Sequence, residues 1–433
     1  MYVADSRGTP APAVTPEPQA VAPGTSPGRR AALAPTVLAL GTVSLITDIS
    51  SEMVAAVLPL YLVAGLGLSP LGFGLLDGLY NGVGALVRLA GGHLGDRFGR
   101  HKALAGIGYA LSALCKPLLL LAHTLPAIGA VLALDRTGKG LRTAPRDALI
   151  SLAAAPEHRG RAFGVHRAMD TAGALIGPVL AFLILRGAAD GYDAVFTVSA
   201  CVAALGVLVL VLFVPGRPAR ARPAAGAEGT GGAADAGTDD RVSLSASLGL
   251  LRGRDLRRTG LCALLLGLCT VSDGFVFLLL QRATGIADRW FALLPLGTAA
   301  AFFLLALPLG RLADRIGRRR VFLGGHLALL LAYGLLLTGG HLWLPYAVLV
   351  LHGGFYAATD GVLMAAAAAA VPEEHRGGGL ALVQTGQALA RFAAALGFGA
   401  AWTFWGPRPA LAVAALLLAA AVGVCVRLRP AAD

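Results

Sequence analysis

The sequence has few charged residues and few aromatic ones. Only 14% of its 433 residues are charged and 6% are aromatic, whereas 56% are hydrophobic. Soluble globular proteins carry about a quarter charged residues. Apolar stretches of roughly 18 to 25 residues, such as 195–214 and 410–426, are each long enough to cross a hydrocarbon core of about 30 Å. This composition excludes an ordinary soluble domain and indicates a polytopic helical membrane protein.

Several motifs that would indicate catalysis or cofactor binding are also missing. The five cysteines form no C-x-x-C pair and all lie in apolar segments, so we expect them to pack as small hydrophobic residues. A phosphate-binding loop would need glycine at position 133 and serine or threonine at position 140, but the sequence has Ala133 and Gly140, so no such loop is expected. No HExxH motif is present, and the charges are dispersed over several apolar segments. We expect no cofactor, no metal and no enzyme activity, and keep a membrane-embedded enzyme as an alternative.

Two segments of low complexity divide the chain. Residues 1–33 are rich in proline, alanine and glycine without an apolar signal-peptide core, and predict a disordered cytoplasmic tail. A second such segment predicts a cytoplasmic linker at 215–256, between six-helix bundles at 34–214 and 257–428, with a cytoplasmic tail at 429–433. The expected fold is all-α with twelve transmembrane helices, near 34–64, 71–92, 103–122, 126–150, 161–185, 193–214, 257–281, 289–309, 321–339, 343–371, 379–404 and 408–427.

The net charge of +12 has two interpretations, because a basic protein can also bind nucleic acid. If the N-terminus is cytoplasmic, 24 of the 36 lysines and arginines fall in segments inside the cell. Only four fall in loops outside: Arg186, Arg282, Arg289 and Arg408. Cytoplasmic loops of membrane proteins are enriched in these residues. The charge therefore predicts a multi-pass protein of the bacterial cytoplasmic membrane with both termini inside, and it argues against a nucleic-acid partner.

The two halves of the chain repeat each other. GHLGDRFGRHK begins at Gly92 and GRLADRIGRRR at Gly310; APEHRGRAFG begins at Ala155 and PEEHRGGGLA at Pro372. Two different motifs recur at nearly the same offset, which indicates duplicated six-helix units, a common plan among secondary transporters.

These repeated motifs resemble those of the major facilitator superfamily, and the likeness extends from about residue 34 to 428. The loop signature G-x-L-x-D-R-x-G-R-R/K of that family is matched by Gly92, Leu94, Asp96, Arg97, Gly99, Arg100 and Lys102, and again by Gly310, Leu312, Asp314, Arg315, Gly317, Arg318 and Arg319. Residues 136–140 resemble its R-x-x-x-G pattern, and Gly173, Gly177 and Pro178 resemble the G-x-x-x-G-P pattern of exporters, although the glycines expected next are absent. The strings TDISSEM, DRTGKGLRTAPRDALI and HRAMDTAGALIGP resemble a bacterial branch of the family whose members mostly have no assigned substrate.

The stretch DRTGKGLRTAPRDALI, residues 135–150, holds six charges directly after an apolar run too short to span a bilayer. On a helix from about 126 to 150, Asp135, Lys139, Arg142 and Arg146 cluster within roughly 60°. A single charged stripe can face the interior of a bundle and avoid lipid, where each charge costs a few kcal/mol. The stretch is therefore expected to form the cytoplasmic half of the fourth span.

Polar stripes in other spans complete the predicted substrate and proton pathway. Its candidate residues are Asp48, Glu52, Asp77, Arg88, Asp135, Arg136, Lys139, His352, Asp360 and Arg391. For Arg142, Arg146, Asp147 and Arg167 we favour structural ion pairs near helix ends.

The resemblance and the stripes together predict secondary active transport of a small solute by alternating access, in a monomer surrounded by lipid. The two loop motifs are expected to act as gates; the resemblance implies that Asp96 and Asp314 each engage the start of a helix in the opposite half of the chain. Asp48 and Glu52, four residues apart, repel each other, so that Glu52 is expected to carry a coupling proton. A basic cavity favours an anionic or zwitterionic metabolite. Proton-driven drug or metabolite efflux is the alternative, and a non-transporting membrane receptor is the alternative from another class.

Overall fold

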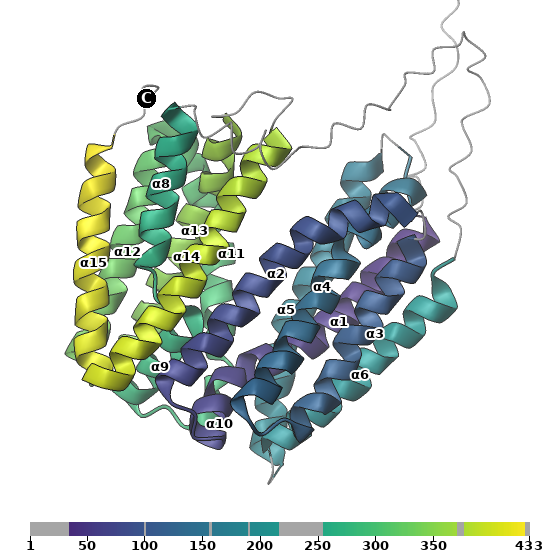
Figure 1. The fold of residues 1–433 in the computed structure, drawn as a ribbon, viewed down its shortest axis with the longest axis horizontal. Helices are drawn as coiled ribbons and strands as arrows, with labels where there is room; N and C mark the ends of the chain where they lie inside the picture. The colour runs from purple at the N-terminus through teal and green to yellow at the C-terminus, as the bar shows by residue number, and fades with distance from the viewer. Residues whose placement is uncertain are drawn as a thin grey trace, which may run out of the picture. The chain divides into compact units, whose positions relative to one another are not determined.

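The computed structural model describes residues 34–98, 101–155, 158–188, 191–215, 254–369 and 376–428 (Figure 1). Over these ranges the regular secondary structure is helical throughout, as the sequence predicts. The expected tails and most of the expected linker lie outside the described residues.

The first group of helices ends before the linker. Its members are α1 (Pro35–Leu60), continued by the π-helical turn η1 (Tyr61–Gly65), α2 (Pro70–Phe98), α3 (His101–Leu121), α4 (Leu125–Ala153), α5 (Arg159–Gly187) and α6 (Gly191–Phe213). Short turns separate neighbouring helices, and α1 packs against both α5 and α6, while α4 packs against α2 and α3.

The second group begins at residue 254. Its members are α8 (Arg254–Leu268), α9 (Asp273–Thr284), the short α10 (Asp288–Phe291), α11 (Leu294–Ile316), α12 (Arg318–Thr338), α13 (Leu344–Ala369), α14 (Arg376–Trp405) and α15 (Pro407–Arg427). Nine helical segments of the described chain are long and apolar enough to cross a membrane. Three more helices, α2, α4 and α14, have 29, 29 and 30 residues. Since about 20 helical residues cross a bilayer, the described chain is consistent with twelve spans.

The seventh expected span, 257–281, agrees with a candidate span at Leu256–Thr284, but it is interrupted, because α8 ends at Leu268 and α9 begins only at Asp273. Ser272 occupies the N-cap position of α9 with an extended backbone (φ −68°, ψ 155°), and an acidic residue follows it in the first turn. Both features favour the start of a new helix. The interruption removes intrahelical partners from the backbone, and the N–H of Val271 donates instead to the hydroxyl of Tyr333 at 2.8 Å. A buried tertiary hydrogen bond thus stabilises the break.

Glycines allow α5 to approach α1 closely. A Cβ atom added at Gly173 would lie 2.5 Å from the carbonyl oxygen of Leu45, and one added at Gly177 would lie 2.8 Å from the Cβ of Glu52. Small residues four apart commonly permit such close helix packing in membranes. The exporter-like motif therefore lies against the part of α1 that carries its acidic residues.

The two groups of helices meet where α2 begins and α14 ends. The N–H of Leu71 donates to the Thr403 hydroxyl at 3.0 Å. The ring of Phe182 lies 4.8 Å from that of Trp290, measured between centroids. Further along α2, a Cβ at Gly78 would lie 3.1 Å from the carbonyl oxygen of Phe392. These contacts close the end of the molecule at which the loop after η1 lies.

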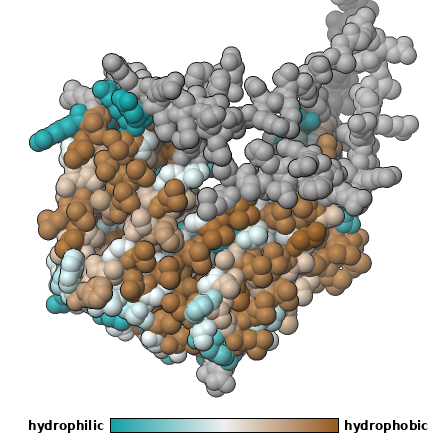
Figure 2. Space-filling view, in the orientation of Figure 1, coloured by the Kyte–Doolittle hydropathy of each residue, from teal (hydrophilic) through white to brown (hydrophobic). Residues whose placement is uncertain are grey.

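Large hydrophobic side chains cover much of the surface drawn in Figure 2. Leu304, Phe404 and Leu416 are 77%, 75% and 71% exposed. Soluble monomers rarely expose large contiguous apolar surfaces, so this exterior fits contact with lipid. The polar residues, by contrast, include many that are buried among the helices, such as Asp48 and Asp135.

We expect Gly177→Ala to lower the stability of the purified protein by about 1–3 kcal/mol, because overpacking forces neighbouring atoms apart. Gly164→Ala is the matched control on the same helix, since a Cβ there would meet nothing within 4 Å. A helical alanine is favoured over glycine, so this control should be neutral or slightly stabilising. Thermal unfolding in detergent measures both, and equal melting temperatures for the two variants would contradict the close approach of α1 and α5.

Candidate functional site

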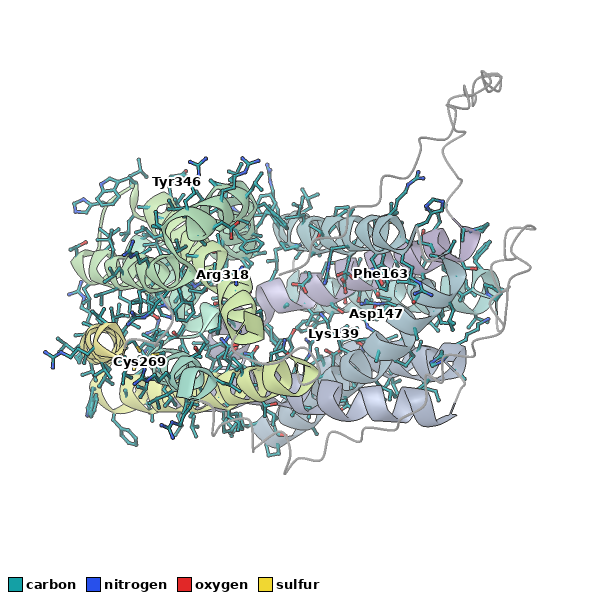
Figure 3. The ribbon with its side chains drawn as sticks, turned by 90° about the horizontal axis from the view of Figure 1, so that it is seen from above. Lys139, Asp147, Phe163, Cys269, Arg318 and Tyr346 are labelled. Carbon is teal, nitrogen blue, oxygen red and sulfur yellow. The ribbon has the colours of Figure 1, made fainter. Side chains whose placement is uncertain are left out.

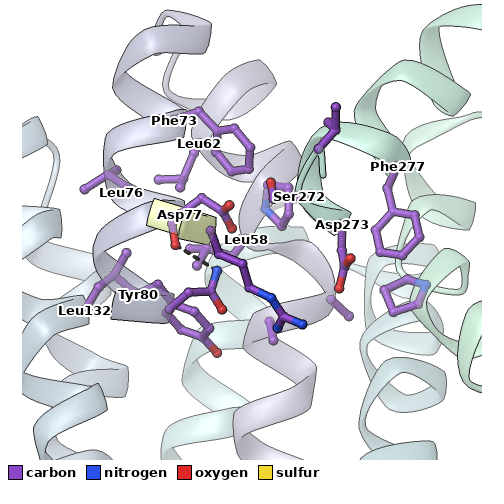
Figure 4. A pocket seen from close by; sticks show the side chains of 18 of the residues that line it. Leu58, Leu62, Phe73, Leu76, Asp77, Tyr80, Leu132, Ser272, Asp273 and Phe277 are labelled. Atoms are coloured by element: carbon purple, nitrogen blue, oxygen red, sulfur yellow. Dashed lines mark hydrogen bonds between the residues drawn. The ribbon is translucent and has the colours of Figure 1, made fainter. Parts of the chain in front are cut away.

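A cavity of about 220 Å³ lies between the two groups of helices (Figure 4). Its wall comes from α1, α2 and α4 of the first group and from α9, α11, α13 and α14 of the second, together with the interrupted segment before α9. The polar or aromatic lining residues are Glu52, Phe73, Asp77, Tyr80, Asn81, Thr270, Ser272, Asp273, Phe277, Tyr356 and Arg391. Both halves of the chain therefore contribute to one polar space.

Two carboxylates from the first group face this cavity. Glu52 is half-buried on α1 and forms no hydrogen bond or ion pair with another described residue. Asp77 lies on α2, and its Oδ2 atom is buried without a hydrogen-bond partner among the described residues. The hydroxyl of Ser272 lies near the Asp77 carboxyl, but without the geometry of a hydrogen bond. The first group of helices therefore presents carboxylate oxygens to the cavity that accept no hydrogen bond from the described residues.

The second group places one carboxylate, Asp273, at the start of α9. Its Oδ1 accepts a hydrogen bond from the Tyr356 hydroxyl at 2.5 Å and lies 3.4 Å from Nε2 of His352. His352 is 1% exposed, and its Nδ1 lies 3.3 Å from the hydroxyl of Thr298. This chain of contacts holds the Asp273 carboxylate in place at the cavity wall.

Arg391 is the one cation among the lining residues of the described cavity. Its Nη2 lies 3.9 Å from Oδ1 of Asp360, and both side chains are about half exposed. Opposite charges at this distance attract, so Asp360 offsets part of the positive charge that Arg391 brings to the cavity.

Asp135 and Arg136 belong to a buried network behind the cavity wall. The Asp135 carboxylate pairs with Lys116 at 2.9 Å and with Arg136 at 2.6 Å, and accepts a hydrogen bond from Ser112 at 2.6 Å. The guanidinium of Arg136 stacks on the ring of Tyr80, 3.8 Å from its centroid. This network joins α3 to α4 and supports a residue of the cavity wall.

A second buried network lies further along α4. Asp48 pairs with Arg142 at 3.3 Å, and Arg146 lies 3.0 Å from Asp147. Lys139 is half-buried within electrostatic range of Asp48. Figure 3 places Lys139 and Asp147 among the helices of the first group.

The expected pathway residues thus separate into sets. Glu52, Asp77 and Arg391 line the cavity; His352 and Asp360 contact residues that line it; Asp48, Asp135, Arg136 and Lys139 lie in or near the buried networks. The side chain of Arg88 lies outside the described residues. The described part of the lining therefore carries three carboxylates and one guanidinium, unlike the basic cavity expected from the sequence.

The first copy of the loop motif ends outside the described part of the chain: nothing is described of Gly99 and Arg100, nor of the side chains of Asp96 and Arg97, although Gly92 lies within α2. The second copy spans the end of α11 and the start of α12. Gly310 lies within α11, Asp314 and Arg315 are exposed in its last turn, and Arg318 begins α12. Gly317 joins the helices with φ +99°, a backbone conformation that favours glycine.

Ser272, Asp273 and Tyr80 are cavity residues that the sequence interpretation missed. The string SDG before an apolar run is a recognisable helix start, because serine followed by an acidic residue is typical of an N-cap. Inside a continuous hydrophobic segment, the length expected of a spanning helix outweighs that signal. Tyr80 carried no signal of its own, since its role depends on Arg136 from another helix.

The comparisons with known proteins agree with this architecture. The model of the Major Facilitator Superfamily matches residues 40–296 and 274–433. The chain belongs to the Major Facilitator Superfamily and is a membrane transporter.

Relatives in other organisms fit this assignment. An uncharacterised MFS-type transporter of Methanocaldococcus jannaschii is 28% identical over 381 residues, which cover 86% of this chain and 89% of the relative. An uncharacterised protein of Mycobacterium tuberculosis is 35% identical over 174 residues, 40% of each chain.

Solved structures share the fold at low identity. The nucleoside transporter NupG superposes with a TM-score of 0.74 at 12% identity, covering 91% of this chain and 98% of that one. A POT family transporter in complex with 5-aminolevulinic acid gives 0.67 at 14% identity, covering 91% and 96%. At such identities the likeness supports the fold alone.

We expect Asp135→Asn to destabilise the protein by about 3–5 kcal/mol, because it leaves Lys116 and Arg136 buried without their counter-charge. Asp147→Asn is the matched control: its side chain is 44% exposed in its pair with Arg146, so the loss should stay below about 1 kcal/mol. Thermal unfolding in detergent compares the two. A parent-like melting temperature for Asp135→Asn would contradict the structural role given to this network.

Proposed function

We propose that this transporter carries a small solute across the bacterial cytoplasmic membrane by alternating access, as a monomer driven by the proton gradient. The observation that supports this proposal is the polar cavity shared by both halves of the chain. In transporters built from repeats, substrate sites lie at the interface between the repeats, and the halves rock around them. The gating loops at Gly92–Arg100 and Gly310–Arg318 would control one end of that movement.

The distribution of cations supports an orientation for the described conformation. The contacts that close the cavity, between Leu71 and Thr403 and between Phe182 and Trp290, lie at the end whose loops carry few lysines and arginines. By the positive-inside rule that end faces outward and both termini face the cytoplasm. The described state is then closed to the outside and faces inward.

Glu52 is the proposed proton carrier. It lines the cavity on α1 and has no ion pair among the described residues, whereas Asp48, one turn away, is already paired with Arg142. A carboxylate that is reached by water and lacks a fixed counter-ion can bind and release a proton as the cavity changes sides.

Export of a drug or metabolite is the second candidate. The packing of Gly173 and Gly177 against α1 favours it, because this exporter-like motif touches the same turns that carry Asp48 and Glu52. Movement of α5 would therefore be transmitted to the proposed proton site.

The proposed topology places two exposed arginines, Arg408 and Arg315, on opposite sides of the membrane, which cysteine substitution at each position can test. On intact cells, a membrane-impermeant maleimide should label Arg408→Cys, while Arg315→Cys should react only after the membrane is opened. The unsubstituted chain, with its five cysteines, gives the background. Labelling of Arg315→Cys on intact cells would overturn the orientation.

Glu52→Gln should abolish proton-driven solute movement while preserving solute exchange, because the amide keeps the shape of the side chain but cannot carry a proton. Proteoliposomes with an internal pH-sensitive dye report proton flux when solutes with ammonium, carboxylate or neutral groups are added. Asp193→Asn, at an exposed acidic residue of α6 outside the cavity lining, is the control. Uptake by Glu52→Gln that still depends on a pH gradient would refute the assignment.

A further inference from the structure

The cavity also indicates which chemical class of solute it takes. We infer that the site selects a small solute bearing an amine cation, held between Asp77 and Asp273. This inference rests on the transport function proposed above and assigns the substrate class of that same cavity.

Charge is the first argument for a cationic solute. Glu52, Asp77 and Asp273 supply three carboxylates to the described lining, which holds one cation, Arg391, within 3.9 Å of Asp360 and within electrostatic range of Asp273. Arg136 and Lys139, outside the lining, act on Glu52, whereas no described cation is within range of Asp77. Asp77 and Asp273 lie within electrostatic range of each other. An anionic solute would add to this repulsion in a medium of low dielectric constant, whereas a cation would relieve it.

Unsatisfied acceptors are the second argument. Asp77 Oδ2 and Ser272 Oγ are buried polar atoms without a hydrogen-bond partner among the described residues. A buried polar group left unpaired costs roughly 1–3 kcal/mol. An ammonium group offers three donors and no acceptor, so it can satisfy both atoms at once. Charge-assisted hydrogen bonds of this kind are about twice as strong as neutral ones.

The position of these atoms links binding to conformational change. Asp77 lies on α2 of the first group, and Ser272 and Asp273 lie at the break before α9 of the second; Figure 4 shows them across the same space. An ammonium between them would bridge the two groups of helices. A cation bound in this way favours the state in which both carboxylates reach it, which is the differential binding that a conformational shift requires.

Aromatic residues are the third argument. The rings of Phe73, Tyr80, Phe277 and Tyr356 line the cavity, and aromatic faces attract cations. Tyr80 already holds the Arg136 guanidinium 3.8 Å from its ring centroid. The lining thus combines acidic groups with rings, which suits an amine with an apolar body.

The size of the cavity restricts the solute further. Its 220 Å³ is below the roughly 300–1,000 Å³ of sites for drug-sized ligands. A monoamine with a short apolar or aromatic body fits this volume better than a bulky drug does.

The test uses matched ligands that differ only in their charged group. Thermal unfolding of the purified full-length protein is measured with tyramine (an ammonium), tyrosol (a neutral hydroxyl) and 4-hydroxyphenylacetate (a carboxylate), and with hexylamine, hexanol and hexanoate. We expect both amines to raise the melting temperature by several degrees and their neutral and anionic partners to leave it unchanged. Stabilisation by the carboxylates alone, or by no member of either series, would overturn the inference.

Variants locate the effect in the cavity. Asp77→Asn and, separately, Asp273→Asn should raise the Kd for tyramine at least about tenfold, as expected for the loss of a charge-assisted hydrogen bond. Asp193→Asn, a carboxylate outside the cavity lining, should leave it unchanged. A parent-like melting temperature without ligand shows that each variant is folded. Unchanged tyramine affinity in both folded cavity variants would contradict the site.

Proteoliposome flux separates this inference from the transport function. Binding of amines without movement of any solute would leave the inference standing and refute transport. Movement of 4-hydroxyphenylacetate without binding or movement of tyramine would leave transport standing and refute the inference.

Discussion

A charge inside a membrane-embedded bundle must be paired or must face water, and this constraint organises the protein. Asp135 with Lys116 and Arg136 joins α3 to α4, and Asp48 with Arg142 joins α1 to α4. Breaking either pair would leave an uncompensated charge in a low-dielectric interior, which costs several kcal/mol. The first group of helices is therefore held together by ionic contacts as well as by packing.

The same constraint explains which charged residues line the cavity. Carboxylates that have no cationic partner within these networks, Glu52 and Asp77, lie where the two groups of helices meet, opposite Asp273. Three of the four cations of α4, Arg136, Arg142 and Arg146, are held in ion pairs, and none of the four lines the described cavity, although Arg136 and Lys139 remain within electrostatic range of Glu52. The acidic character of the site thus follows from the structural role of its neighbours.

The sequence predicted the helices well because long apolar runs and repeated loop motifs depend on local composition alone. It missed the break at Cys269–Ser272, since the bond from Val271 to Tyr333 that stabilises it comes from a distant helix. It also assigned Arg136 and Lys139 to a basic cavity. A helical stripe predicts which residues share a face, but only the packing of α2 and α3 against α4 places Tyr80 on Arg136 and Lys116 beside Asp135.

The most direct test of this account is whether water reaches the break in the second group from one side of the membrane. Asp273→Cys places a thiol at the half-exposed lining residue that begins α9, and this thiol can be treated with a small impermeant methanethiosulfonate, with the unsubstituted chain as the background for Cys269. Rapid reaction in inside-out vesicles and much slower reaction on intact cells is the predicted result. Absence of reaction from either face would show a dry core at this position and contradict the account.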